Sequence, residues 1–249
     1  MEILLAAALG LAFGHALDLL FTRFYREESI DGPLYRCPKC KAGFRPAFAL
    51  PIVGYALNLG RCPDCREPLP LRVVVLPVGG AALFVASQLV FDEFGAGLLG
   101  GVFATLFLTL TLTDLDRRLL PNRIVYPATM LAVTLSWGWP DSSFVDVLAG
   151  GLIAILIAAT LLIISLPFGA GAFGMGDVKM IVLIGFVVGL PSIFVGIFIG
   201  TIAAAAASIF LIATRIKGRK DYIPHGPFLA LGAVVAMFWG TDIWEAYWG

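Results

Sequence analysis

Eight long apolar runs, separated by polar segments, account for most of the chain. Runs of about 20 apolar residues are typical of helices that cross a bilayer. The runs that begin at Ile124 and Val178 are shorter than this and must use their polar flanks to cross. The pattern predicts an all-α polytopic membrane protein with eight transmembrane helices. In order, the eight runs are Ile3 to Phe21, Val73 to Phe91, Gly97 to Leu112, Ile124 to Trp139, Phe144 to Pro167, Val178 to Gly189, Ser192 to Thr214 and Phe228 to Trp244.

The composition agrees with a membrane protein. Of the 249 residues, 59% are hydrophobic and 14% are charged, whereas soluble domains are about 45–50% apolar. The formal net charge is zero, so nothing indicates nucleic-acid binding. The first run has no basic residue before it and no small-residue cleavage site after it. We therefore expect a permanent helix rather than a secretory signal.

The positive charges fall on one side of the predicted bundle. All 17 Lys and Arg residues lie in four segments, which share one membrane face if there are eight helices: residues 23–72, residues 117–123, Lys179 and residues 215–220. The opposite face carries only acids. Because basic loops stay in the cytoplasm, the first face is predicted to be cytoplasmic, and both termini are predicted to lie outside. An odd number of helices would mix the two faces.

The segment between the first two helices, residues 23–72, holds all four cysteines. They form two C-x-x-C pairs, Cys37 with Cys40 and Cys62 with Cys65, separated by 21 residues. This spacing is typical of a tetrahedral four-thiolate zinc site. With four protein ligands the zinc would be structural, and it would supply folding free energy to a segment too small for a large core. Free buried thiols, disulfides and a redox dithiol are the alternatives, of which a reducing cytoplasm disfavours the disulfides.

Two acids are expected at the cytoplasmic ends of helices. Asp177 follows a glycine-rich turn that includes Gly174 and Gly176, and Asp114 follows the third apolar run. Ionised acids beside apolar sequence are costly in a membrane and indicate a functional site. Each acid alone also has a simpler interpretation, with Asp177 as an ordinary helix-start acid and Asp114 as part of a solvated loop with Asp116. Their shared face and depth favour a paired site.

Four ordered motifs span nearly the whole chain: the two C-x-x-C pairs, Asp114-Leu115-Asp116 running into Leu120-Pro121-Asn122, Gly174-Met175-Gly176-Asp177-Val178-Lys179, and Tyr222-Ile223-Pro224-His225-Gly226-Pro227-Phe228. In these motifs the chain resembles the type IV prepilin leader peptidases, membrane aspartic proteases of the GxGD type. The resemblance implies that Asp114 and Asp177 are the catalytic aspartates, with Asp116 as the alternative to Asp114. Gly174, Gly176 and Lys179 would support them.

The resemblance implies an aspartic endopeptidase of the bacterial cytoplasmic (inner) membrane, with its active site facing the cytoplasm. Its substrates would be prepilins or prepilin-like proteins of type IV pilus or type II secretion systems, whose basic leader is cut just after a glycine. Two nearby carboxylates share one proton, so the charged acid can activate water while the neutral acid donates to the scissile carbonyl oxygen. No covalent intermediate is needed.

Many relatives also methylate the new amino terminus with S-adenosylmethionine, and here the chain departs from the family pattern. Relatives carry a glutamate shortly after the cysteine loop, whereas residues 72–91 contain no acid. Gly14-His15-Ala16-Leu17-Asp18 stands where relatives commonly show Gly-Ser-Phe-Leu-Asn. Methylation therefore stays open. We interpret His15 and Asp18 as interhelical hydrogen-bonding residues, with a role in methyl transfer as the alternative.

Two basic side chains lie near the predicted pair of acids. Lys179 either lowers the charge cost of the pair or anchors its helix at the headgroups. His225, in a Pro-Gly turn, is expected to position the last helix beside the site, with a catalytic role as the alternative.

The expected organisation is a first transmembrane helix over residues 1–22, a cytoplasmic zinc-binding loop domain over residues 23–72 and a seven-helix membrane peptidase core over residues 73–249. Two other classes of function stay open. An ion-coupled transporter would hold its acids near the bilayer midplane, between inverted repeats, which the sequence does not show. A non-enzymatic membrane zinc sensor would need the cysteines but would tolerate loss of both aspartates.

Overall fold

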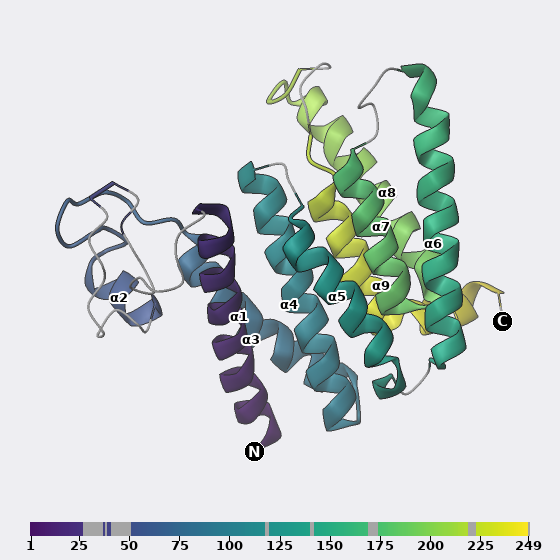
Figure 1. Ribbon diagram of the computed structural model, residues 1–249, viewed down its shortest axis with the longest axis horizontal. Coiled ribbons are helices and arrows are strands. Elements are labelled where there is room, and N and C mark those ends of the chain that lie inside the picture. The colour runs from purple at the N-terminus through teal and green to yellow at the C-terminus, as the bar shows by residue number, and fades with distance from the viewer. Residues whose placement is uncertain are drawn as a thin grey trace.

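A computed structural model describes residues 1–26, 37, 39–40, 51–117, 120–139, 142–168, 174–218 and 223–248. Every α-helix in these ranges except α2 joins one bundle, and residues 51–71, which include α2, project from its side (Figure 1). Short 3-10 turns follow α5 and α6, at Ser136–Gly138 and Leu166–Phe168. The α-helices are α1 (Glu2–Arg26), α2 (Pro51–Leu57), α3 (Arg72–Val90), α4 (Phe94–Arg117), α5 (Asn122–Thr134), α6 (Phe144–Ser165), α7 (Met175–Val188), α8 (Ser192–Ala213) and α9 (Gly226–Trp248).

Six of the described helices are long and apolar enough to cross a membrane, namely α1, α3, α4, α6, α8 and α9. They make the chain a multi-pass membrane protein. Helices α5 and α7 have only 13 and 14 residues. At 1.5 Å per residue α7 is about 21 Å long, against a hydrocarbon core of about 30 Å. These are the two runs predicted to be short, and the count of eight crossings stays a prediction.

Successive bundle helices run in opposite directions, so both marked chain ends lie at the same end of the bundle (Figure 1). At the other end, α1, α4, α6 and α8 finish and α3, α5, α7 and α9 begin. The basic residues described close to these helix ends include Arg26, Arg72, Arg117, Arg123, Lys179 and Arg215. The bundle therefore gathers positive charge at one end, as the charge pattern predicts.

Helix α4 continues past the end of its apolar run. The run ends at Leu112, but α4 extends to Arg117. The hydroxyl of Thr113 donates a hydrogen bond to the carbonyl of Leu110 at 2.7 Å, so this polar side chain is satisfied within the helix. Hydropathy alone places Asp114 after the helix, whereas the structure places it inside the last turn.

Helix α4 is also the best-buried helix of the bundle. In its apolar window 67% of the residues are buried, against 22–50% in the other five long helices. Phe103, Phe107 and Leu110 of α4 are at most 1% exposed and belong to one core cluster with Met180 and Ile184 of α7. Since interiors of this kind are close-packed, the helix that carries Asp114 is firmly held.

Glycines set the spacing between neighbouring helices. A Cβ on Gly10 of α1 would lie 2.5 Å from the carbonyl oxygen of Gly80 in α3. A Cβ on Gly150 of α6 would lie 2.7 Å from the carbonyl oxygen of Gly185 in α7. No side chain larger than hydrogen fits at these distances, so the α1–α3 and α6–α7 pairs pack backbone against backbone.

Candidate active site and metal centre

Asp114 lies in the last turn of α4 and is 5% exposed. Its Oδ2 accepts a hydrogen bond from the backbone amide of Gly226 at 3.2 Å. Gly226 is the first residue of α9, where the backbone amides have no partner within the helix. The start of α9 thus supplies a hydrogen-bond donor to Oδ2 of Asp114 and places the positive end of its helix dipole beside this oxygen.

Only glycine at position 226 allows the Asp114 carboxylate to come this close to the backbone. A Cβ at this position would lie 2.5 Å from Oδ2 and 2.9 Å from Cγ of Asp114. The sequence motif indicated that the turn before α9 borders the site, but it did not identify Gly226 as the partner of Asp114. The signal was the His-Gly-Pro order at a helix start, where a glycine amide is free to bind an anion.

Asp177 lies in the first turn of α7 and is half-buried. It interacts electrostatically with Asp114, and the imidazole of His225 interacts with both carboxylates. Three helix ends therefore converge, since Asp114 ends α4, Asp177 begins α7 and His225 directly precedes α9. The catalytic pairing of the two acids stays a prediction.

The two glycines of the predicted motif lie against this site. A Cβ on Gly174 would lie 3.1 Å from Oδ2 of Asp177, and a Cβ on Gly176 would lie 3.3 Å from Cδ1 of Leu120. Both distances are tighter than ordinary contact. The remaining glycine-rich residues, 169–173, lie outside the described ranges.

Asp116 has different surroundings from Asp114. Its side chain is 52% exposed, and Oδ2 pairs with Nη1 of Arg72 at 3.1 Å. Two residues along a helix rotate a side chain by about 200°, so Asp114 faces α9 while Asp116 faces α3. Lys179 is half-buried and forms no ion pair with any acid that the structure describes.

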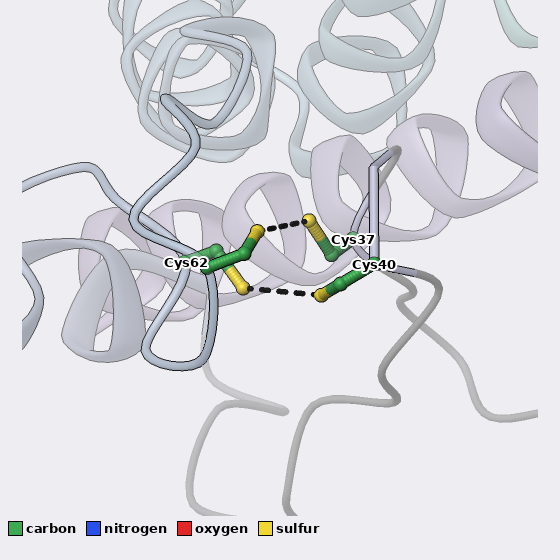
Figure 2. A group of neighbouring side chains, drawn as sticks. Cys37, Cys40 and Cys62 are labelled. Atoms are coloured by element: carbon green, nitrogen blue, oxygen red, sulfur yellow. Dashed lines mark hydrogen bonds between the residues drawn. The ribbon is translucent and has the colours of Figure 1, made fainter.

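The four cysteines form one cluster. Their sulfur atoms all lie within 4.8 Å of one another. Sγ of Cys37 is 3.5 Å from Sγ of Cys65, and Sγ of Cys40 is 3.8 Å from Sγ of Cys62 (Figure 2). In a tetrahedral site with Zn–S bonds of about 2.3 Å the sulfurs are about 3.8 Å apart. No disulfide joins these four described cysteines, and their spacing fits a metal ion.

Local hydrogen bonds hold the two cysteine pairs in place. The amide of Cys62 donates to the Glu67 carbonyl at 2.8 Å, and the amide of Arg66 donates to the Cys62 carbonyl at 3.0 Å. Nζ of Lys39 pairs with Glu67 at 3.0 Å and so joins the first pair to the second. These contacts shape the cluster without a large core.

One of the thiols is prepared for ionisation. Burial raises the pKa of Cys37, but hydrogen bonds from the backbone amides of Cys40 and Lys39 outweigh it and lower this pKa to about 7. A thiolate is the form that binds a metal ion. The cluster therefore has the spacing that a thiolate-bound metal requires, and Cys37 is the thiol that ionises most readily of those whose pKa is shifted.

The fold and the cysteine cluster define a multi-pass helical membrane protein with four thiols that could hold a metal ion. The chain belongs to the type IV leader peptidase family. The sequence model described as "Type IV leader peptidase family" matches residues 101–209, and that described as "Bacterial Peptidase A24 N-terminal domain" matches residues 8–91. The first match contains both acids of the pair, and the second contains all four cysteines.

Curated relatives match over most of the chain. A "Prepilin leader peptidase/N-methyltransferase" of Pseudomonas putida is 27% identical over 218 residues, which cover 86% of this chain and 75% of the relative. The protein of the same name from Bacillus subtilis (strain 168) is 27% identical over 245 residues, covering 96% of this chain and 94% of the relative. That of Aeromonas hydrophila is 26% identical over 230 residues, covering 89% and 79%. No solved structure matches the chain.

Proposed function

We propose that the protein is a membrane aspartic endopeptidase that removes the basic leader from prepilins or prepilin-like proteins. The observation that carries this proposal is the burial of Asp114 against the amide of Gly226, within range of an electrostatic interaction with Asp177. The family and the printed names of the relatives support a leader peptidase.

The geometry suits acid-base hydrolysis. Close carboxyl groups share one proton, so the pair acts as a unit in which one acid is charged and one is neutral. The charged acid draws a proton from a water molecule, which attacks the scissile carbonyl carbon, while the neutral acid donates its proton to the carbonyl oxygen. The amide of Gly226 holds Oδ2 of Asp114 and leaves Oδ1 available for proton transfer.

Asp114 is favoured over Asp116 as the first acid of the pair. Asp116 is half-exposed and engaged by Arg72, whereas Asp114 is buried and interacts with Asp177. Asp116 would instead help to hold the end of α4. Gly174 and Gly176 would let the chain pass tightly around Asp177.

The pair would work at the cytoplasmic face of the bacterial inner membrane. It lies at the end of the bundle that gathers the basic residues, and basic segments stay in the cytoplasm. A substrate with a basic leader keeps that leader on the same side, so the cleavage point would arrive at the depth of the two acids. A transporter would need acids near the bilayer midplane and is disfavoured by the position of both acids at helix ends.

Cys37, Cys40, Cys62 and Cys65 would hold a zinc ion with a structural role. Four thiolates fill a tetrahedral shell and leave no position for substrate or water. When bound, the ion would supply folding free energy to the loop. A membrane zinc sensor stays the alternative, and it would tolerate loss of both aspartates.

Methylation of the new amino terminus is a second proposed activity, because the relatives are named as N-methyltransferases as well as peptidases. It would require S-adenosylmethionine. One experiment tests both activities: the purified protein in phospholipid vesicles is incubated with a pilin-like precursor, with and without S-adenosylmethionine, and the products are read by intact mass. Loss of the leader supports the peptidase, and a further gain of about 14 Da supports methylation.

Matched variants decide the roles in the same assay. Asp114→Asn and Asp177→Asn should each abolish leader loss while the protein stays folded and inserted. Full cleavage by either variant would overturn the paired-acid assignment. Full cleavage by the wild type with no mass gain would leave the peptidase and remove the methyltransferase.

A further inference from the structure

Arg72 joins three helices at the basic end of the bundle. It is the first residue of α3, and its Nη1 lies 3.1 Å from Oδ2 of Asp116 in α4. Its Nε lies 3.5 Å from Oδ1 of Asp18 in α1, and its guanidinium carbon lies 4.4 Å above the centre of the Phe21 ring. The Arg72 side chain is 14% exposed and that of Asp18 is 0% exposed. The Arg72–Asp18 side of this cluster is buried, whereas Asp116, on the other side of Arg72, is 52% exposed.

We infer that Arg72 is a positioning residue that couples the cysteine loop to the paired acids, an inference that rests on the proposed peptidase function. Arginine suits the task, because its planar guanidinium can bind two carboxylates and stack on an aromatic ring at once. A buried arginine and aspartate depend on each other, since losing one leaves the other as an uncompensated buried charge.

The cysteine loop determines where Arg72 stands. The segment after Cys65 pairs with the segment before Cys62, where the amide of Leu69 donates a hydrogen bond to the carbonyl of Gly60 at 2.8 Å. Arg61 and Pro68 form a bridge across the same turn. Arg72 follows Leu69 by three residues at the start of α3. The position of the guanidinium therefore depends on the second cysteine pair being folded.

On its other side, Arg72 acts on the helix turn that carries Asp114. Asp116 is two residues further along and points the opposite way, toward α3. The ion pair between Arg72 and Asp116 holds the last turn of α4 in place, so that Asp114 stays against Gly226. A displacement of the cysteine loop would therefore move Arg72, and through its ion pair with Asp116 it would move the helix turn that carries Asp114.

The test compares four proteins in the precursor-cleavage assay: wild type, Arg72→Ala, a loop variant with Cys62→Ser and Cys65→Ser, and their combination. Small displacements of reacting groups cost up to about 100-fold in rate. We expect Arg72→Ala to lower kcat by roughly 10- to 100-fold with KM nearly unchanged. Zinc content, measured on the same samples, should stay at the wild-type level in Arg72→Ala.

The combination distinguishes coupling from two separate effects. If the loop acts on the acids through Arg72, the combined variant is no slower than the slower of the two parents, because each change breaks the same connection. If the two rate losses multiply, or if Arg72→Ala keeps the wild-type kcat, the inference is overturned. A wild type that does not cleave the precursor would instead refute the proposed function.

A folding defect needs its own control, because Arg72→Ala leaves Asp18 without its cation. The double variant Arg72→Ala with Asp18→Asn removes that buried charge. A stable double variant that remains slow supports positioning through Asp116, and one with the wild-type kcat overturns it. Arg72→Lys keeps the charge but not the two-sided geometry, and it should recover stability more than kcat.

Discussion

The contact between Gly226 and Asp114 gives the sharpest prediction, through the variant Gly226→Ala. The new Cβ would lie 2.5 Å from Oδ2 of Asp114, where ordinary contact begins at 3.4 Å. The carboxylate must therefore move by about 1 Å, and it loses or lengthens its 3.2 Å hydrogen bond to the Gly226 amide. Misplacement of a reacting group by about 1 Å costs on the order of 100-fold in rate, or about 2.7 kcal/mol in the activation free energy.

The assay is the kcat for leader removal from a pilin-like precursor in vesicles, with thermal unfolding measured alongside. Alanine is a better helix former than glycine, so Gly226→Ala should lose activity without losing the helix. Gly95→Ala is the matched control, because this glycine also lies in the first turn of a helix and its Cβ would meet no atom within 4 Å. The reasoning is refuted if Gly226→Ala and Gly95→Ala both cleave at the wild-type rate.

Three further predictions follow from the site, the cluster and the packing. Asp116→Asn breaks the ion pair with Arg72, so it should lower kcat by no more than Arg72→Ala does, roughly 10- to 100-fold, whereas a loss as complete as that of Asp114→Asn would make Asp116 the catalytic acid. Chelation of the metal should unfold the loop and increase proteolysis within residues 27–72, because bound zinc supplies about 10–16 kcal/mol of folding free energy in zinc-finger peptides. An unchanged digestion pattern would contradict a structural ion. Gly150→Ala should lower stability by about 1–3 kcal/mol through overpacking against α7, seen as a lower melting temperature than that of Gly95→Ala, and an equal melting temperature would show that α6 and α7 can separate at no cost.

The parts of this protein that local sequence encodes were predictable. The two C-x-x-C pairs specify thiols at fixed spacing, and the four sulfurs do lie within 4.8 Å of one another. Apolar runs specify helices, and the two short runs became α5 and α7. The apolar run within α4 ends at Leu112, so hydropathy predicts a helix end there. The helix continues to Arg117, because polar residues can keep the helical backbone hydrogen bonds without adding apolar character.

The contacts that give each acid its role were not predictable from local pattern. Gly226 and Asp114 are 112 residues apart, and Arg72 and Asp116 are 44 apart. No periodicity links such positions, because only the packing of helices brings them together. The sequence alone therefore left Asp116 as an alternative to Asp114, and the different surroundings of the two side chains favour Asp114 in the function that we propose.

The shortness of α7 has a consequence for how a peptide bond at the membrane surface meets water. A helix of about 21 Å cannot match a hydrocarbon layer of about 30 Å, and bilayers respond to such mismatch by thinning locally. Headgroups and solvent would dip toward the protein where α7 starts, which is where Asp177 stands. The enzyme would then need no sealed water channel, since the deformed leaflet itself would bring the hydrolytic water to the acids.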